Sequence, residues 1–274
     1  MQKANKLDGI PVVPEFQRLW PSFAVLGMRV DVVGLPDVLS VMQAWITERG
    51  PARCLVAANS HLVMECNRDP ALRQAVNKAD LVLPDGIPLV LVGRRRGMPM
   101  KGRVPGPDLL HAALDHSKLR GCRHFFYGGT RDTLDALLAS AIERWPHAQI
   151  VGTHAPPFRQ LTAAEDQEIV AIINDAAPDV LWVSLGCPKQ ERWMHEHRDR
   201  LKVPVVAAVG QAVGIAAGVK RDVPDWIGKH GLEWLFRVVL EPRRTWSRVF
   251  LLGPAFAVYV ALEELGLRRY EGGR

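Results

Sequence analysis

The sequence predicts an α/β fold built on a mostly parallel sheet with helices on both faces. Apolar, strand-type runs alternate with helix-type segments from residue 24 onward, and this alternation is typical of parallel sheets. Several of the runs are apolar throughout, as expected of strands that are buried on both faces. The order of elements is therefore Rossmann-like, and we expect ligands to bind beyond the carboxyl ends of the strands.

The expected elements follow one another at short intervals. Apolar runs predict strands at residues 24–33, 53–58, 81–83, 124–127, 149–152, 180–185 and 205–209. The segments between them predict helices at residues 36–47, 61–77, 107–117, 132–144, 162–176 and 189–200. A chain of 274 residues is long enough for one such domain with an appendage.

Three segments divide the chain. We expect a loosely ordered leader at residues 1–22, the α/β domain at residues 23–218, and a C-terminal helical appendage at residues 219–274. In the appendage, tryptophans, phenylalanines and arginines recur together, and prolines break the expected helices. An aromatic and basic amphipathic helix can lie flat on an anionic membrane. Packing on the main domain, with the arginines in water, would give the same pattern.

Composition limits the classes of protein. Lys and Arg number 35 against 29 Asp and Glu, so the net charge is +6, and the excess gathers in residues 93–103 and in the appendage. Such patches suit phosphates or an anionic membrane surface. We expect no nucleic-acid partner, because the aromatic residues gather in the appendage rather than on a platform of strands.

Cysteine usage and hydropathy limit the cellular compartments in which we expect the protein. The four cysteines form no CxxC pair, which favours a reducing compartment and argues against a disulfide framework or a zinc site. The N-terminus has no long apolar core of the secretory type. No uncharged apolar run reaches the roughly 18 residues that a membrane-spanning helix needs.

An acidic side chain follows the strand expected at residues 81–83. Asp85 lies in a Pro-Asp-Gly turn, and Gly86 removes side-chain bulk beside it. A carboxylate there can act as a general base on an acceptor hydroxyl within hydrogen-bond reach. The alternative is that Asp85 caps a helix that starts near Ile87 and serves only the fold.

A cation and an amide follow other turn signals. Arg103 lies in a basic loop, where a guanidinium can hold a diphosphate in a bidentate way or remain solvated. Lys189 and Gln190 open a helix after the strand expected at residues 180–185, just beyond Gly186, and can point at a ligand over the sheet edge. Ordinary helix-start chemistry would give the same residue types.

Glycines after another strand indicate a phosphate site. Gly128 and Gly129 follow the strand expected at residues 124–127 and open a helix, whose N-terminus favours an anion. The dinucleotide and P-loop fingerprints are absent, which argues against dehydrogenase and nucleotide-hydrolase classes. There is also no HExxH and no Asp-x-Asp pair, so we expect no metal and no cofactor.

Together these motifs resemble the WecG/TagA/CpsF family of bacterial glycosyltransferases, over about residues 25–248. Three stretches carry the resemblance in combination: ADLVLPDG at residues 79–86, GCPKQE at residues 186–191, and GLEWLFR at residues 231–237 followed by EPRR at residues 241–244. The resemblance implies an inverting, metal-independent transfer of a sugar from a UDP-sugar donor to a polyprenyl-diphosphate-linked sugar acceptor, in cell-wall or exopolysaccharide synthesis. The donor sugar would be N-acetylmannosamine, glucose or a uronic acid.

The resemblance also implies a place in the cell and roles for residues. The enzyme would be cytoplasmic and peripheral on the inner face of the bacterial cell membrane, whose anionic surface is a further partner; self-association into a homo-oligomer stays open. The family's base aspartate falls on Asp85, its arginine on Arg103 and its glutamine on Gln190, which are the expected catalytic residues. The expected substrate-binding residues are Asn59, Gly86, Gly128, Gly129, Gly186, Lys189, Arg221 and Arg237.

Two departures from the family pattern fall near the expected sugar pocket. The chain has Ala-Ala-Asn at residues 57–59 where the family often has Thr-x-Asn, and Gln-Ala-Val-Gly at residues 211–214 where the family tends to carry a Phe-Asp pair. Both concern the donor sugar more than the type of reaction. The lost hydroxyl at Ala57 motivates an alternative, a non-catalytic membrane-docked subunit of a polysaccharide assembly complex. The joint presence of the three expected catalytic residues argues against it.

Overall fold

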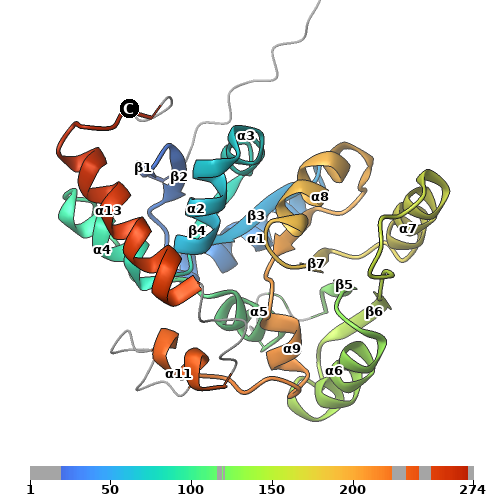
Figure 1. The fold of residues 1–274 in the computed structure, drawn as a ribbon. Helices are drawn as coiled ribbons and strands as arrows, with labels where there is room; N and C mark the ends of the chain where they lie inside the picture. Colours follow the sequence, from blue (N-terminus) through green and yellow to red (C-terminus); the bar gives the residue numbers. More distant parts are fainter. Residues whose placement is uncertain (1–19, 116–118, 120, 224–232, 241–247, 271–274) are drawn as a thin grey trace, which may run out of the picture.

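A six-stranded parallel sheet forms the centre of the molecule (Figure 1). The computed structural model describes residues 20–115, 119, 121–223, 233–240 and 248–270. Across the sheet, the strands follow the order β4 (Leu81–Pro84), β3 (Arg53–Ala58), β8 (Val205–Ala208), β7 (Val180–Ser184), β5 (Arg123–Gly128) and β6 (Gln149–His154). Each neighbouring pair is parallel, so the prediction of a mostly parallel sheet is confirmed.

Helices cover both faces of this sheet, as predicted. One face carries α2 (Ser60–Arg68), α3 (Pro70–Asn77), α4 (Ile87–Arg95), α7 (Ala163–Asp175) and α8 (Lys189–His197), which runs into the short 3-10 helix η2 (Arg198–Arg200). The other face carries α1 (Leu35–Glu48), α5 (Gly106–Asp115), α6 (Arg131–Arg144) and α9 (Ala212–Ala216). Alternate residues of β3 enter the two buried clusters: Cys54 and Val56 lie in one, and Leu55 lies in the other. The strand is thus buried on both faces, which explains its continuous apolar run.

The first expected strand is two strands. Residues 24–33 were expected as one extended run, but the chain folds into an antiparallel hairpin of β1 (Ser22–Val25) and β2 (Met28–Asp31). The two turn residues, Leu26 and Gly27, both have positive φ, at 50° and 77°. Two-residue turns of this kind usually contain Asn-Gly or Asp-Gly. Here an apolar residue precedes the glycine, so the sequence does not indicate the turn.

The helix expected at residues 61–77 is also two helices. The break lies at Asp69, whose side chain accepts hydrogen bonds from the backbone N–H groups of Ala71 and Leu72 and so caps α3. Pro70 then occupies the first turn of α3, where its missing N–H costs nothing. A proline also disfavours helical backbone in the residue before it, which ends α2 at this point.

The hairpin covers the edge of the sheet that β4 forms. The Asp31 carboxylate accepts a 2.8 Å hydrogen bond from the Val82 N–H, and it forms an ion pair with Arg29 at 3.3 Å. The Arg29 guanidinium in turn donates to the Ala79 carbonyl at 2.5 Å and to the Asn77 carbonyl at 3.1 Å. An edge strand with unpaired N–H groups invites association with other chains, and this arrangement satisfies one of them internally.

The C-terminal part of the chain returns to the main body. It includes α11 (Glu233–Leu240), the π-helical segment η3 (Arg248–Leu252) and α13 (Gly253–Glu264), and α13 packs against α2 with Phe256 and Val260 in the buried cluster of that face. Glu263 accepts a 2.7 Å ion-pair contact from Arg96 and a 3.2 Å hydrogen bond from the Leu26 N–H. The division into a domain and an appendage at residue 218 stays a prediction, and most of the expected leader lies outside the described residues.

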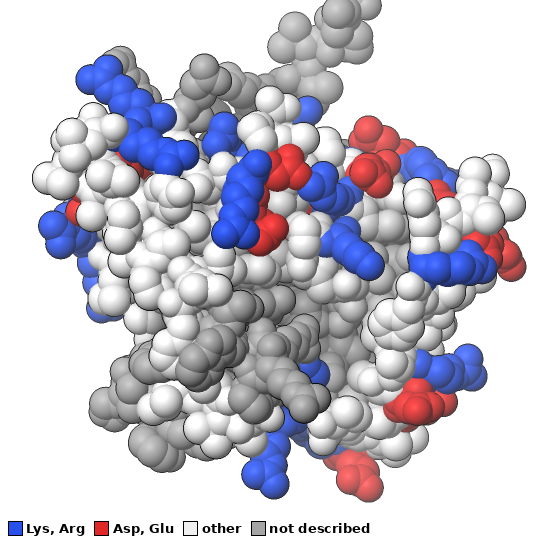
Figure 2. Space-filling view, viewed as in Figure 1, with Lys and Arg blue, Asp and Glu red and all other residues white. Residues whose placement is uncertain are grey.

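The surface over α13 is poor in charge. Figure 2 shows Lys, Arg, Asp and Glu side chains interspersed over much of this face and a largely uncharged area where Figure 1 places α13. Large apolar side chains are exposed there, among them Leu251 (67%) and Val258 (59%). Within the described residues, no helix combines the length and the apolar character needed to cross a membrane.

The Asp31 contacts give a test of how the hairpin is held. Replacing Asp31 with Ala leaves the buried Val82 N–H without its acceptor and the buried Arg29 without its ion pair. We expect the free energy of unfolding, measured by urea denaturation, to fall by about 3 kcal/mol. The control is Asp135→Ala, which removes a surface ion pair with Arg131 and should cost less than about 0.5 kcal/mol. Equal effects in the two variants would contradict the role given to Asp31.

Candidate active site

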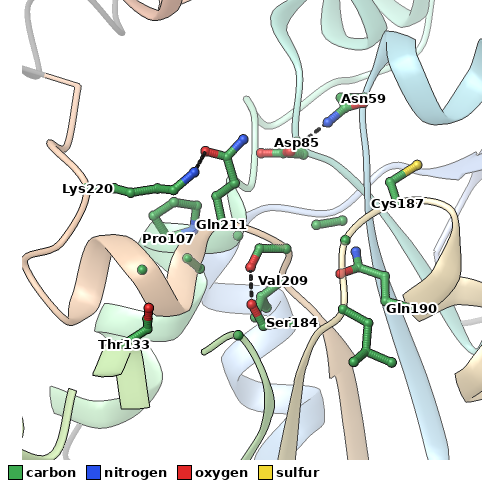
Figure 3. Close-up of a pocket in the computed structure, with 18 of the residues that line it drawn as sticks. Asn59, Asp85, Pro107, Thr133, Ser184, Cys187, Gln190, Val209, Gln211 and Lys220 are labelled. Carbon is green, nitrogen blue, oxygen red and sulfur yellow. Dashed lines mark hydrogen bonds between the residues drawn. The ribbon is translucent and has the colours of Figure 1, made fainter. Parts of the chain in front are cut away.

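A cavity of about 470 Å³ opens at the carboxyl ends of the parallel strands (Figure 3). Residues at or just beyond the ends of β3, β4, β5, β7 and β8 line it, so five neighbouring strands contribute to one site. Of the sequence-predicted residues, this cavity brings together Asn59, Asp85, Gly129, Gly186 and Gln190. Binding at this edge is the arrangement expected of an open α/β sheet.

Asp85 and Asn59 form the polar centre of the cavity. The Asn59 amide nitrogen lies 3.4 Å from the Asp85 carboxylate oxygen Oδ2. Asn59 is also the N-cap of α2: its Oδ1 atom accepts hydrogen bonds from the N–H groups of His61 and Leu62 at 3.1 and 3.2 Å. Because the cap fixes Oδ1, the amide nitrogen has to face away from the helix, and it faces Asp85.

The alternative role for Asp85, as a helix cap, is wrong. The N-cap residue of α4 is Gly86, which has no side chain and makes no side-chain cap hydrogen bond. The Asp85 backbone N–H instead donates to the Ala58 carbonyl at 2.9 Å, which ties the turn to the end of β3. The carboxylate is half-buried and lines the cavity.

Gln190 and Glu191 form a buried pair at the start of α8. The Gln190 amide nitrogen donates to the Glu191 Oε1 atom at 2.8 Å, and both residues line the cavity. Burial raises the pKa of Glu191, and the hydrogen bond from Gln190 partly offsets that rise. Within the described part of the chain, the buried Gln190 Oε1 atom has no hydrogen-bond partner. It can therefore accept a hydrogen bond from a ligand hydroxyl or amide.

The four predicted glycines divide into two groups. Gly129 and Gly186 line the cavity and have φ of 84° and 82°, a backbone conformation that favours glycine. Gly128 and Gly86 are not in the lining, and both have close neighbours. A β-carbon at residue 128 would lie 2.5 Å from the Ser184 carbonyl oxygen, and one at residue 86 would lie 3.3 Å from the Asn59 β-carbon.

The predicted cations do not line the cavity within the described residues. Lys189 and Arg221 are exposed, Arg103 is half-buried outside the lining, and the Arg237 side chain lies outside the described residues. The lining instead includes Lys220, whose ammonium donates to the Gln211 Oε1 atom at 3.1 Å. Sequence reasoning missed Lys220, since no local motif marks it apart from its place in a basic stretch.

No metal centre stands out in the described part of the chain. Among those residues, no group of three or more His, Cys, Asp or Glu side chains is arranged to hold a metal ion. The described lining of the cavity offers two carboxyl groups, three amides and an ammonium, which belong to Asp85, Glu191, Asn59, Gln190, Gln211 and Lys220. Such a set can accept a proton, orient hydroxyl groups and bind an anion.

Comparison with known proteins identifies the family. The chain is similar to an N-acetylglucosaminyldiphosphoundecaprenol N-acetyl-beta-D-mannosaminyltransferase of Bacillus spizizenii, with 26% identity over 230 residues, which cover 84% of this chain and 87% of the relative. A protein of the same description from Staphylococcus aureus is 26% identical over 226 residues, covering 82% and 85%. The family described as "Glycosyl transferase WecG/TagA/CpsF family" matches residues 23–270. The match spans nearly the whole chain and confirms the resemblance seen in the motifs, so this protein belongs to the WecG/TagA/CpsF family of glycosyltransferases.

Proposed function

We propose that this protein transfers N-acetylmannosamine from a UDP-linked donor to polyprenyl-diphosphate-linked N-acetylglucosamine, with inversion and without a metal ion. The observation that carries the proposal is the cavity in which Asp85, Asn59 and Gln190 meet at one edge of the sheet. The names of the two relatives support the choice of acceptor and of sugar. Family membership supports the reaction type.

The reaction that we propose starts with proton transfer to Asp85. Its carboxylate takes the proton of the acceptor hydroxyl as that oxygen attacks the anomeric carbon of the donor sugar, on the face opposite the leaving UDP. The Asn59 amide holds the carboxylate in one orientation, which keeps the base in reach of the attacking hydroxyl. The buried Oε1 atom of Gln190, which has no partner within the described residues, accepts a hydrogen bond from the donor sugar and fixes its orientation.

The proposal is tested with purified protein, a panel of UDP-sugars and a short polyprenyl-diphosphate N-acetylglucosamine mimic. The panel contains UDP-N-acetylmannosamine, UDP-glucose and UDP-glucuronate, because the residues at 57 and 211–214 depart from the usual pattern. We expect transfer from UDP-N-acetylmannosamine to be the fastest, to invert the anomeric centre by NMR, and to continue in EDTA. Absence of transfer from every donor would contradict the function, and loss of activity in EDTA would contradict metal independence.

Replacing Asp85 with Asn removes the proposed base without changing its size. We expect turnover to fall about 10²- to 10⁴-fold, the usual contribution of a positioned general base. Thermal stability should stay unchanged because Gly86, not Asp85, is the N-cap residue of α4. Asp175→Asn, at an exposed position on α7, is the matched control and should keep full turnover. Near-normal turnover in Asp85→Asn would show that another group takes the proton.

Replacing Asn59 with Asp tests the contact between the two side chains. An aspartate still caps α2, so the fold should remain intact. A second carboxylate beside Asp85 disfavours its charged form, so the acid limb of the pH–rate profile should move to higher pH by about one unit or more. The comparison variant Asn59→Ser also keeps the cap and loses the same amide contact but adds no charge, so its acid limb should move less than that of Asn59→Asp. If the acid limb of the profile does not move in Asn59→Asp, then residue 59 does not influence the ionisation of the base.

We further propose that the protein docks on the cytoplasmic face of the cell membrane through the uncharged surface around α13 (Figure 2). Leu251 and Val258 are exposed there, and Leu265 and Leu267 follow with 71% and 72% exposure. Arg268 and Arg269, both exposed, lie beside these leucines. Exposed apolar side chains next to cations are what an anionic lipid surface binds.

Replacing both Leu251 and Val258 with Gln should weaken sedimentation with vesicles of phosphatidylglycerol and phosphatidylethanolamine. Each apolar side chain that enters the interface contributes about 1 kcal/mol or more, so we expect a loss of at least about tenfold. The matched control is Ile142→Gln, since Ile142 is 76% exposed on α6 and should not matter. Equal binding of the double variant and the parent protein would show that the protein does not dock through this surface.

A further inference from the structure

The donor that we propose adds negative charge to the cavity. A UDP-sugar carries a diphosphate, and more negative charge develops on it as the sugar leaves. The described lining already holds two acidic side chains, Asp85 and Glu191. Without a cation nearby, repulsion would oppose both binding and departure of the diphosphate.

Within the described lining, Lys220 is the one Lys or Arg. Of the cations that the sequence suggested, Lys189 and Arg221 are exposed and Arg103 is half-buried, and all three lie outside the lining, while the Arg237 side chain lies outside the described residues. Lys220 directly precedes Arg221 in the chain, so a single step along the backbone separates the residue in the cavity from the one in solvent.

Contacts with α9 hold Lys220 in the cavity. Its backbone N–H donates to the Gly214 carbonyl at 3.0 Å, and its aliphatic stem passes over the same glycine. A β-carbon at residue 214 would lie 3.4 to 3.8 Å from the Lys220 Cδ, Cγ and Cε atoms, so a longer side chain at 214 would need the space that the stem fills. The absence of a side chain at Gly214 therefore leaves the lysine its path.

Gln211 directs the end of the lysine. Its Oε1 atom accepts from the Lys220 ammonium at 3.1 Å, and because an amide is neutral, this bond orients the ammonium without cancelling its charge. In the view of Figure 3, Lys220 enters on one side of the cavity, and Gln211 lies between it and Asp85.

We propose that Lys220 is a catalytic residue that binds the diphosphate of the UDP-sugar donor. This inference rests on the proposed function. In the transfer, the bond between the anomeric carbon and the β-phosphate oxygen breaks, and its electron pair stays on that oxygen. The acceptor oxygen forms the new bond to carbon, and its proton passes to Asp85. Lys220 keeps its proton throughout and stabilises the charge that grows on the leaving UDP.

The test compares Lys220→Met, Lys220→Arg and the parent protein. Methionine keeps an unbranched stem over Gly214 and removes the charge, whereas arginine keeps the charge. Lys202→Met is the matched control, since Lys202 is exposed in the segment just before β8, at the opposite edge of the sheet. Binding of uridine, UDP, UDP-glucose and UDP-glucuronate is measured by calorimetry on the full chain, and turnover is measured with the donor that the parent uses.

We expect Lys220→Met to weaken UDP binding about 10- to 100-fold and to leave uridine binding unchanged, as the loss of a charge-assisted contact predicts. Turnover should fall with it, Lys220→Arg should restore much of both, and Lys202→Met should match the parent. Unchanged UDP binding in Lys220→Met would overturn the inference, and a loss confined to UDP-glucuronate would assign the lysine to a sugar carboxylate instead. If the parent protein binds no uridine nucleotide at all, the proposed donor fails, which is a different result.

Discussion

The pairing of β3 with β4 is the constraint on which the site depends. Because these strands are parallel and Ala58 pairs with Pro84, the next residue of each strand leaves the sheet at the same edge. Those residues are Asn59 and Asp85, and they meet at 3.4 Å. A shift of one residue in this register would turn every side chain of β4 to the other face and separate the two polar groups. The apolar packing of β3 and β4 on both faces of the sheet therefore also fixes the geometry of the polar site.

One side chain, Asn59, joins local structure to chemistry. Its carbonyl oxygen satisfies two N–H groups at the start of α2, and its amide nitrogen is left for the carboxylate. Serine or aspartate would serve the cap equally well, but neither has an N–H group to donate. An asparagine is thus the residue that starts α2 and orients a carboxylate at the same time. Its presence at this position is better explained by both tasks than by capping alone.

The sequence predicts the sheet well because the relevant signals are local. Continuous apolar runs such as residues 180–185 leave little choice for buried parallel strands, and Asp85 and Asn59 follow such runs directly. The hairpin at Leu26 and Gly27 was missed because its turn residues carry no usual turn signal. The positions of cations were harder to predict for another reason. A lysine or arginine side chain is long, and whether it enters a cavity depends on the path of the loop and on space left by residues such as Gly214.

The arrangement of charge suggests how the two substrates approach. In the reaction that we propose, Lys220 attracts the diphosphate at one side of the cavity and Asp85 receives the proton at another, which puts the donor sugar between them and the acceptor at the Asp85 side. Asn59 contacts Asp85 and is also the N-cap residue of α2, and α13 packs on α2. The surface proposed to meet the membrane is therefore connected through one helix to the base that the acceptor must reach. A lipid-linked acceptor would approach from that surface while the nucleotide enters from the side of α9, so that neither has to pass the other.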